Sequence, residues 1–323
     1  MRFGVISTAD IALKSFLPGV ARTDHDVVAI ASRDAERAAA VAADHGIPES
    51  YGSYDVLLDA DIDAVYNPLP NGLHAEWTTR AADAGLDVLC EKPLASDAAE
   101  ARAVADHCRD AGVTLMEAFM YRYHPRTERV RDLLAEMGDV VSAEATFGFP
   151  LYGAPEDVRL DPGLAGGSLM DVGCYPVHAL RTFLGDPEAV TASTYDSRDC
   201  GVDTRLVGTF EYEDGARATL RSWFDAPERQ QYRIETTDGW VEVPDPAFNV
   251  PSDAPAELRY AVDGREVTES FDPVDQYARE VEHFADRVAA GETPATGGES
   301  AVANMRVIDA LYEAAATGER VRP

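Results

Sequence analysis

MRFGVISTADIA, residues 1–12, opens the chain and decides the fold. Its apolar segment, residues 3–6, is short and uninterrupted, which is typical of a buried parallel strand. Ser7, Ala9 and Ala12 follow at the spacing of the G-x-G-x-x-G/A turn that binds dinucleotides. We expect Ser7 to adopt an ordinary rather than a left-handed backbone conformation. We also expect the hydroxyls of Ser7 and Thr8 to donate to a phosphate at the start of the next helix.

Strands and helices alternate over the first third of the chain. Five apolar runs are separated by Ala-rich amphipathic stretches of helical length, a pattern that predicts a doubly wound parallel sheet of the Rossmann type. The predicted strands are residues 2–6, 27–31, 62–66, 86–90 and 113–116, and the predicted helices are 10–22, 34–45, 72–84 and 97–111. Gly85 and Gly112 stand where helices end, as C-cap residues do.

The second part of the chain is rich in strands. We predict helices at 123–137, 168–184, 274–290 and 299–317, and strands at 139–149, 188–196, 202–212, 216–225, 231–236, 239–243, 256–262 and 265–270. Asp-Gly pairs at 214–215, 238–239 and 263–264 predict hairpin turns. The sequence therefore predicts an α/β protein with two domains. Residues 1–118 form the Rossmann domain. Residues 119–323 form a substrate-binding and oligomerisation domain with a large, mostly antiparallel sheet, and the last helix is able to return to the first domain.

The charge of the chain restricts its partners. Its 58 acidic and 28 basic residues give a net charge of −30, which disfavours nucleic acid as a ligand. No apolar run is long enough to span a membrane, and no signal peptide is evident, so we expect a cytoplasmic protein. The four cysteines form no C-x-x-C pair and the seven histidines are scattered, so we expect no metal. Only Lys14 and Lys92 are lysines, and this acidic, lysine-poor composition, of the haloarchaeal type, favours a halophilic protein over an acidic mesophilic one.

The end of the second predicted strand favours NADP, although NAD remains possible. Sites that prefer NAD place Asp or Glu there to bind the ribose 2′-hydroxyl. This chain has Ser32 and Arg33, with Arg37 one helical turn later, and guanidinium groups bind phosphate in bidentate fashion. Alternatively, the two arginines only balance Asp34 and Glu36 at the start of a solvated helix.

Two further segments carry residues suited to proton transfer. Lys92 follows a buried strand and precedes a proline, and lysine, unlike arginine, can lose its proton in a cleft. Asp171, Tyr175 and His178 fall four and three residues apart, on one face of the predicted helix. The preceding pair at 166–167 is Gly-Gly, which permits close backbone approach.

Five segments, in this order and spacing, resemble the glucose–fructose oxidoreductase/inositol dehydrogenase/rhizopine catabolism (Gfo/Idh/MocA) family. They are ISTADIA, ASRDAERA, NPLPNGLHAEWTTRAADAGLDVLCEKPLA, EAFMYRYHP and AGGSLMDVGCYPVHALRTFLG. The resemblance is nearest to the branch of D-xylose 1-dehydrogenase and dimeric dihydrodiol dehydrogenase. Tyr175 marks that branch, since inositol dehydrogenases carry His there. The resemblance implies an NADP-dependent dehydrogenase that transfers a hydride between the nicotinamide and a sugar or polyol carbon, most simply an aldose 1-dehydrogenase.

The resemblance also implies roles for individual residues. The essential lysine falls on Lys92, the second acid/base position on Tyr175, and the supporting carboxylate on Asp171. The substrate would be bound by Arg159, Asp171, Tyr175 and His178. The cofactor would be bound by Ser7, Thr8, Ala9, Ile11, Ser32, Arg33, Arg37, Asn67, Pro68, Pro70, His74 and Glu91.

Two positions depart from the family pattern. Relatives usually have Trp-Arg before the Gly-Gly pair, whereas this chain has Val158-Arg159, which leaves the outline of the substrate pocket open. Asp10 replaces a residue that is often basic, and its carboxylate suits a pyrophosphate site only if it points outward, as a helix N-cap does.

Two other functions fit the same residues. One is a trans-dihydrodiol dehydrogenase of the same family, and the other is an NADP-binding sensor without catalysis. We expect a homodimer or homotetramer formed through the second sheet.

Overall fold

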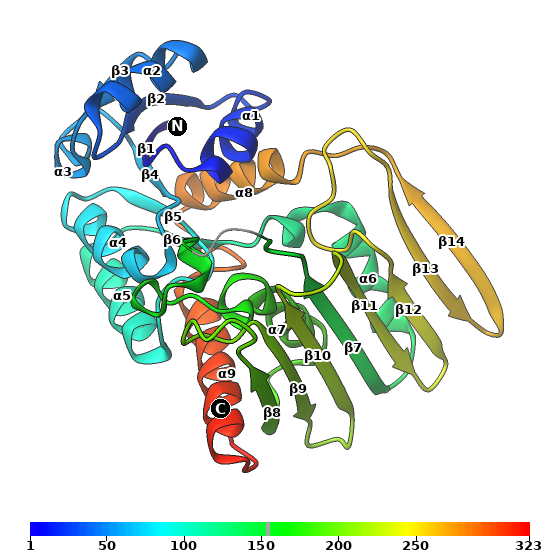
Figure 1. The fold of residues 1–323 in the computed structure, drawn as a ribbon. Coiled ribbons are helices and arrows are strands. Elements are labelled where there is room, and N and C mark those ends of the chain that lie inside the picture. The colour runs from blue at the N-terminus through cyan, green and yellow to red at the C-terminus, as the bar shows by residue number, and fades with distance from the viewer. Residues whose placement is uncertain (153–155) are drawn as a thin grey trace. The chain divides into compact units, whose positions relative to one another are not determined.

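The computed structural model describes residues 1–152 and 156–323, and the chain divides into two compact units. The first unit combines Met1–Met120 with Asp275–Val302, and the second combines Tyr121–Val274 with Ala303–Pro323. Figure 1 traces the course of the chain through both. That residues 1–118 and 119–323 form separate domains stays a prediction. None of the described helices is apolar and long enough to cross a membrane.

The first unit is built on a six-stranded parallel sheet with the strand order β3-β2-β1-β4-β5-β6. Its strands are β1 (Arg2–Ile6), β2 (Asp26–Ala31), β3 (Glu49–Tyr51), β4 (Ala64–Asn67), β5 (Asp87–Glu91) and β6 (Leu115–Ala118). Its helices are the π-helical turn η1 (Ala12–Phe16), α1 (Leu17–Val20), α2 (Ala35–His45), α3 (Tyr54–Leu58), the 3₁₀ turn η2 (Asn71–Leu73), α4 (His74–Asp83), α5 (Ala98–Ala111) and α8 (Gln276–Ala290). The strand order confirms the predicted doubly wound sheet, whose ligands bind at the carboxyl ends of the strands.

Local signals fix the helices of this unit. Asp34 caps α2, Asp97 caps α5 and Asp275 caps α8, and each accepts hydrogen bonds from backbone N–H groups of the first turn. Gly112 ends α5 in the left-handed conformation, with φ of 75°. At the centre of the sheet, the rings of Phe16 and Tyr66 stack with 3.8 Å between their centroids, and both are fully buried.

The second unit is built on an eight-stranded sheet with the order β14-β13-β12-β11-β7-β10-β9-β8. The strands are β7 (Val140–Gly148), β8 (Ala189–Tyr195), β9 (Arg205–Glu211), β10 (Arg217–Trp223), β11 (Arg229–Thr236), β12 (Gly239–Val243), β13 (Ala256–Val262) and β14 (Arg265–Phe271). The β7–β10 pair is parallel and the other neighbouring pairs are antiparallel, so the predicted mostly antiparallel sheet is confirmed.

Helices cover one face of this sheet. The helical segments are η3 (Met120–Tyr123), α6 (Pro125–Glu136), η4 (Val158–Leu160), η5 (Pro162–Leu164), the π-helical turn η6 (Leu169–Gly173), α7 (Cys174–Leu184) and α9 (Gly298–Thr317), of which η3 and α9 begin within the residues of the first unit. The helix α7 packs on β7 and β10, and α6 packs on β12 and β13. Residues of β11 alternate between buried and partly exposed, as they must when one face of a sheet is covered and the other is open.

Candidate active site

The turn after β1 adopts the conformation that glycine provides in dinucleotide turns. Ser7 has a φ of 140°, which lies in the region that favours glycine. Our expectation of an ordinary backbone at Ser7 is therefore wrong, because the tight step from β1 toward η1 requires this φ whichever residue stands there. Holding a serine in this region costs on the order of 1–3 kcal/mol. Thr8 is buried and Ala9 is partly exposed, and the Ala9 carbonyl accepts a hydrogen bond from the Leu13 N–H at 3.2 Å.

The carboxylate of Asp10 is accompanied by a lysine. Lys14 Nζ donates to Asp10 Oδ2 at 2.6 Å, and about three quarters of each side chain is exposed. An exposed pair of this kind contributes little stability, roughly 0–1 kcal/mol. The ammonium nevertheless offsets the negative charge that Asp10 places beside the turn, and Ile11, the next residue, is only partly exposed.

The arginines after β2 are left available to a ligand. Ser32 Oγ accepts the Asp34 N–H at 3.1 Å, and the Asp34 side chain caps α2. Arg37 Nη2 donates to the Thr8 carbonyl at 3.1 Å and so ties α2 to the turn after β1. Within residues 1–152 and 156–323, neither Arg33 nor Arg37 forms a salt bridge with Asp34 or Glu36, so both arginines remain candidates for binding a ligand. Two guanidinium groups near the turn suit the 2′-phosphate of NADP.

The segment after β4 is stabilised by buried polar side chains. Asn67 is fully buried, and its Nδ2 donates at 3.2 Å both to the His74 carbonyl and to Thr78 Oγ1. His74 is 1% exposed, and its ring lies between two backbone carbonyls, with Nδ1 2.7 Å from Pro93 O and Nε2 2.6 Å from Leu69 O.

Burial, together with the charge of Lys92, lowers the pKa of His74 to about 4, so the ring is neutral at pH 7 and donates to one of these two carbonyls. Asn67 and His74 thus hold the turn that contains Pro68 and Pro70. Pro68 is buried and Pro70 is partly exposed.

Lys92 lies directly after β5 and is partly buried. Glu91 Oε1 accepts a hydrogen bond from the Tyr66 hydroxyl at 2.7 Å, and the Leu94 N–H donates to Glu117 Oε1 at 2.8 Å. Sequence reasoning assigned no role to Glu117. Its position in the sequence could have indicated a role, because a carboxyl group near the end of an apolar strand lies at the carboxyl edge of the sheet, where ligands bind.

In the second unit, a π-helical turn begins the helix that carries the predicted residues. Asp171 lies in η6 and Tyr175 and His178 lie in α7, so the predicted helix is confirmed but its first turn is wider than an α-helical turn. The Gly-Gly pair permits this start, because a Cβ on Gly166 would lie 2.5 Å from the Arg159 carbonyl oxygen. Gly167 has a φ of 121°, and π-helical turns are frequent at functional sites.

A carboxylate that sequence reasoning missed anchors this helix start. Asp203 is 6% exposed, and its Oδ2 accepts the Ser168 hydroxyl at 2.6 Å and the Leu169 N–H at 2.9 Å. Its Oδ1 accepts the Tyr312 hydroxyl at 2.7 Å, and burial raises the pKa of Asp203. Nothing in the local sequence pairs residue 203 with residue 168, because the contact depends on the fold.

Tyr175 lies among aromatic rings. It is 6% exposed, and its ring centroid is 5.3 Å from that of Phe147, 5.6 Å from that of Phe248 and 6.1 Å from that of Tyr121. His178 lies deeper in the unit, with its Nδ1 2.6 Å from the Tyr121 hydroxyl. Burial lowers the pKa of His178 well below its usual range, so its ring is neutral. The hydrogen bond to Tyr121 gives His178 a structural role, and a contact of His178 with substrate stays a prediction.

Arg159 is oriented by two carboxylates. Its Nε donates to Asp171 Oδ2 at 2.9 Å, and its Nη1 lies 3.3 Å from Asp157 Oδ1. The charge of Asp171 is the main cause of the raised pKa of Arg159. Val158, which stands at the family's usual Trp, is 43% exposed.

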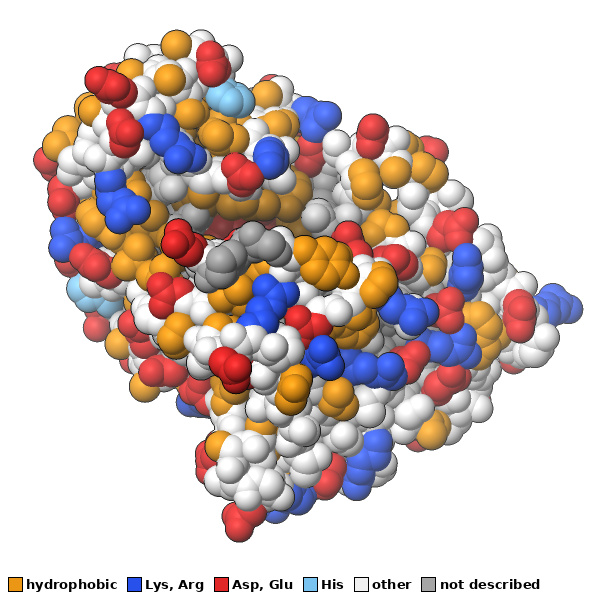
Figure 2. Space-filling view, in the orientation of Figure 1, with side chains coloured by type: hydrophobic (Ala, Val, Ile, Leu, Met, Phe, Trp, Pro, Cys, Tyr) orange, Lys and Arg blue, Asp and Glu red, His pale blue; other side chains and the backbone are white. Residues whose placement is uncertain are grey.

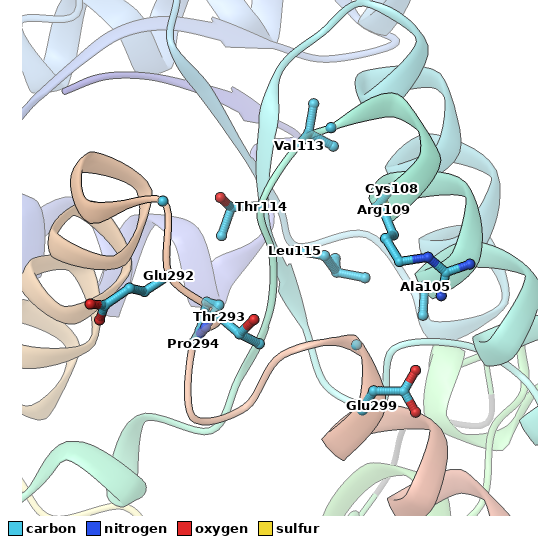
Figure 3. A pocket seen from close by; sticks show the side chains of 13 residues that line it. Ala105, Cys108, Arg109, Val113, Thr114, Leu115, Glu292, Thr293, Pro294 and Glu299 are labelled. Carbon is cyan, nitrogen blue, oxygen red and sulfur yellow. The ribbon is translucent and has the colours of Figure 1, made fainter.

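Neither of two further hollows is lined by these residues. A cavity of about 340 Å³ in the first unit lies between the end of α5, the start of β6 and the segment from α8 to α9 (Figure 3). A hollow of about 450 Å³ lies on the open face of the second sheet, over β7, β10 and β11.

Comparisons with known proteins cover almost the whole chain. A model of the oxidoreductase family with an NAD-binding Rossmann fold matches residues 1–119, and the model of the GFO/IDH/MocA C-terminal domain matches residues 127–242. D-xylose 1-dehydrogenase (NADP(+)) 2 of Haloferax volcanii is 59% identical over 323 residues, which cover 99% of each chain. Trans-1,2-dihydrobenzene-1,2-diol dehydrogenase of Xenopus laevis is 39% identical over 246 residues, 75% of this chain and 73% of that protein.

Among solved structures, the crystal structure of a 3-ketoreductase from Actinomadura kijaniata in complex with NADP and TDP-benzene superposes with a TM-score of 0.91. The two sequences are 33% identical, and the match covers 97% of each chain. The predicted resemblance, the fold and the branch nearest to D-xylose and dihydrodiol dehydrogenases are thereby confirmed. The chain belongs to the GFO/IDH/MocA family of oxidoreductases.

Proposed function

We propose that this protein is an NADP-dependent aldose 1-dehydrogenase that oxidises the anomeric hydroxyl of D-xylose or a closely similar sugar. The observation that carries the proposal is the 59% identity, over 99% of both chains, to the D-xylose 1-dehydrogenase of Haloferax volcanii. Because NADP is an intracellular cofactor, we also propose a cytoplasmic location.

The residues of the first unit suit NADP. The glycine-like φ of Ser7 lets the backbone turn closely around a pyrophosphate, and Arg33 and Arg37 carry the charge that a 2′-phosphate requires. Bound NADP⁺ would supply the hydride acceptor. The remaining predicted residues would complete this site, chiefly by shaping the turns after β1, β2, β4 and β5. They are Thr8, Ala9, Ile11, Ser32, Asn67, Pro68, Pro70, His74 and Glu91.

Lys92 and Tyr175 would take part in the transfer of the proton that the sugar hydroxyl loses. The ammonium of Lys92 would polarise this hydroxyl, and the phenolate form of Tyr175 would accept its proton, becoming the phenol, as the hydride leaves the carbon. With the ordinary pKa of about 10, little phenolate is present at pH 7, so in this proposal the positive charges of Lys92 and of the oxidised nicotinamide would favour the phenolate. Arg159 and Asp171, which are paired with each other, would offer a donor and an acceptor to the other sugar hydroxyls.

A substrate panel tests the proposal. Purified protein in molar KCl is mixed with NADP⁺ and a series of pentoses, hexoses, inositols and trans-dihydrodiols, and NADPH formation is followed by absorbance. We expect the highest kcat/KM with D-xylose or a near epimer. The identity to the Xenopus laevis dihydrodiol dehydrogenase gives the second candidate, which a preference for dihydrodiols would establish. Tight NADPH binding without turnover of any member would favour the sensor function instead.

We also propose that the open face of the second sheet joins copies of the chain into a dimer or tetramer. Side chains of both charges lie there, including Glu144, Arg217, Arg233 and Glu235 around the hollow, and Val207 is 52% exposed. Figure 2 shows acidic and basic side chains intermingled over the strands of this sheet. Light scattering in molar KCl would reveal the assembly, and a monomer at micromolar concentration would contradict it.

A further inference from the structure

We propose that Glu117, at the carboxyl end of β6, is a positioning residue for Lys92. The inference rests on the proposed function, because Lys92 must take part in the reaction for its position to matter. Glu117 does not itself need to touch substrate or cofactor. It acts on the backbone that immediately follows Lys92.

The carboxylate of Glu117 is buried and directed at this backbone. Glu117 is 0% exposed, and its Oε1 accepts a hydrogen bond from the Leu94 N–H at 2.8 Å. Burying a carboxyl group is unfavourable unless hydrogen bonds compensate it. A fully apolar residue would fill the same space without this cost, so the carboxylate is better explained by its hydrogen bond than by packing.

Glu117 is itself fixed at both of its backbone polar groups. Its N–H donates to the Thr296 carbonyl at 2.8 Å, and its carbonyl accepts the Thr296 hydroxyl at 2.6 Å. Thr296 is 0% exposed and lies just before α9. The carboxylate therefore projects from a rigid support.

The peptide group between Pro93 and Leu94 is held at both ends. Its N–H donates to Glu117, and in the tautomer that carries the His74 proton on Nδ1, its carbonyl oxygen accepts a hydrogen bond from that nitrogen at 2.7 Å. These two side chains come from the segments after β4 and at the end of β6, on the two sides of β5. A planar peptide held at its oxygen and its hydrogen has little freedom to rotate. Since this peptide directly follows Lys92-Pro93, the clamp fixes the direction in which the Lys92 side chain leaves the sheet.

The same pair of strands offers a matched control. At the opposite end, Asp87 Oδ1 of β5 accepts the Thr114 N–H at 2.6 Å, just before β6. This contact is also a carboxylate-to-amide bond between β5 and β6, but it lies at the amino end of the sheet, remote from Lys92 in the strand. A purely structural role for such bonds predicts similar effects at both ends.

Four variants test the proposal, namely Glu117→Gln, Glu117→Asp, Glu117→Ala and the control Asp87→Ala. Glutamine keeps an acceptor at the same reach, whereas aspartate keeps the carboxyl group but is one methylene too short. We expect Glu117→Asp and Glu117→Ala to lower kcat about 10- to 100-fold, with the Kd for NADPH changed less than threefold. We expect Glu117→Gln to retain kcat within about fivefold, and Asp87→Ala to lose thermal stability without losing kcat.

The outcomes distinguish the catalytic role of Lys92 from the positioning role of Glu117. A Lys92→Met variant with normal turnover would overturn the proposed catalytic role of Lys92. If Lys92→Met is inactive but Glu117→Asp retains full kcat, the positioning role of Glu117 alone is wrong. Loss of kcat in Asp87→Ala equal to that in Glu117→Asp would also overturn it, because the effect would then follow from stability. If Glu117→Ala does not fold, the Gln and Asp variants still decide.

Discussion

Lys92 and Tyr175 share one proton-transfer step in the proposed reaction. Lys92→Met removes the ammonium and Tyr175→Phe removes the phenol while keeping the ring among its aromatic neighbours. Each substitution should lower kcat by about 10² to 10⁴, the usual contribution of positioned acid–base groups. The double variant should be little slower than the slower single variant, because groups that act together are not additive. Steady-state kinetics on the best sugar of the panel measures all three.

Binding of NADPH provides the control for these variants. A fluorescence titration should give a nearly unchanged Kd in each, since neither side chain is assigned to the phosphates. Near-normal turnover of Tyr175→Phe would remove Tyr175 from the mechanism and leave Lys92 to provide the proton route.

Arg33 should set the choice of cofactor, because its guanidinium is available to a 2′-phosphate. The wild type should use NADP with a kcat/KM at least about tenfold above that for NAD, which corresponds to roughly 1.4 kcal/mol. Arg33→Asp should reverse this preference, since a carboxylate repels the phosphate and accepts the ribose hydroxyl. A wild type that uses both cofactors equally well would contradict the assignment.

At the scale of elements, the sequence was informative wherever a pattern was long or capped. The helices α2, α5 and α8 begin and end close to their predicted residues because Asp caps and terminal glycines mark them. The strand β3 (Glu49–Tyr51) and the helix α3 (Tyr54–Leu58) were missed, since three and five residues are too few to show a period. The π-helical turns also escaped prediction, because they depend on packing rather than on composition.

The same distinction holds for the candidate site, where local motifs were informative and contacts between distant residues were not predicted. Local motifs and the family resemblance single out Lys92 and Tyr175 as candidates, and their roles stay predictions. Glu117 and Asp203 act through contacts with Leu94 and with Ser168, 23 and 35 residues away in the chain, and no local pattern records such pairs. The φ of Ser7 was predicted wrongly because its side chain suggested an ordinary conformation, whereas the strand-to-helix turn imposes a glycine-like one.

The helix α8 carries an acidic group that should make stability depend on pH. Glu280 is 1% exposed, and within the described residues its Oε1 has no hydrogen-bond partner. Burial, followed by the charge of Glu91, raises the pKa of Glu280 well above the value of 4.5 for an exposed glutamate. Unfolding therefore releases a proton when the pH lies between these two values. The contribution of Glu280 to stability is greatest below pH 4.5 and falls as the pH rises through the folded-state pKa.

Glu280→Gln should remove this dependence, because glutamine is neutral at every pH. We expect the variant to be more stable than the wild type at pH 7–8, by roughly 1–3 kcal/mol, and similar to it near pH 4. Thermal unfolding in molar KCl at both pH values measures the difference. Glu282→Gln is the control and should change little, because the Glu282 side chain is 43% exposed and its pair with Arg279 is a surface salt bridge of small energy. Equal stability of Glu280→Gln and wild type at pH 8 would show that Glu280 ionises freely.

For the whole molecule, the charge of −30 should make folding depend on salt. Repulsion among so many carboxylates acts over about 30 Å at 0.01 M salt but over only about 3 Å at 1 M. We therefore predict that activity and cooperative unfolding require molar KCl or NaCl. Activity assays and thermal unfolding over a salt series measure this, and full activity and stability in dilute buffer would exclude a halophilic enzyme.

Because the chain contains only two lysines, the amine of Lys92 can be labelled selectively. Lys14 is exposed and paired with Asp10, whereas Lys92 is partly buried after β5. In a Lys14→Arg variant, Lys92 would carry the only side-chain amine of the protein. Reductive methylation with ¹³C-labelled formaldehyde would then place an isotopic label at Lys92 and at the α-amino group of the N-terminus alone. The titration of that NMR signal would report the ionisation of Lys92 directly, without mutation at the site.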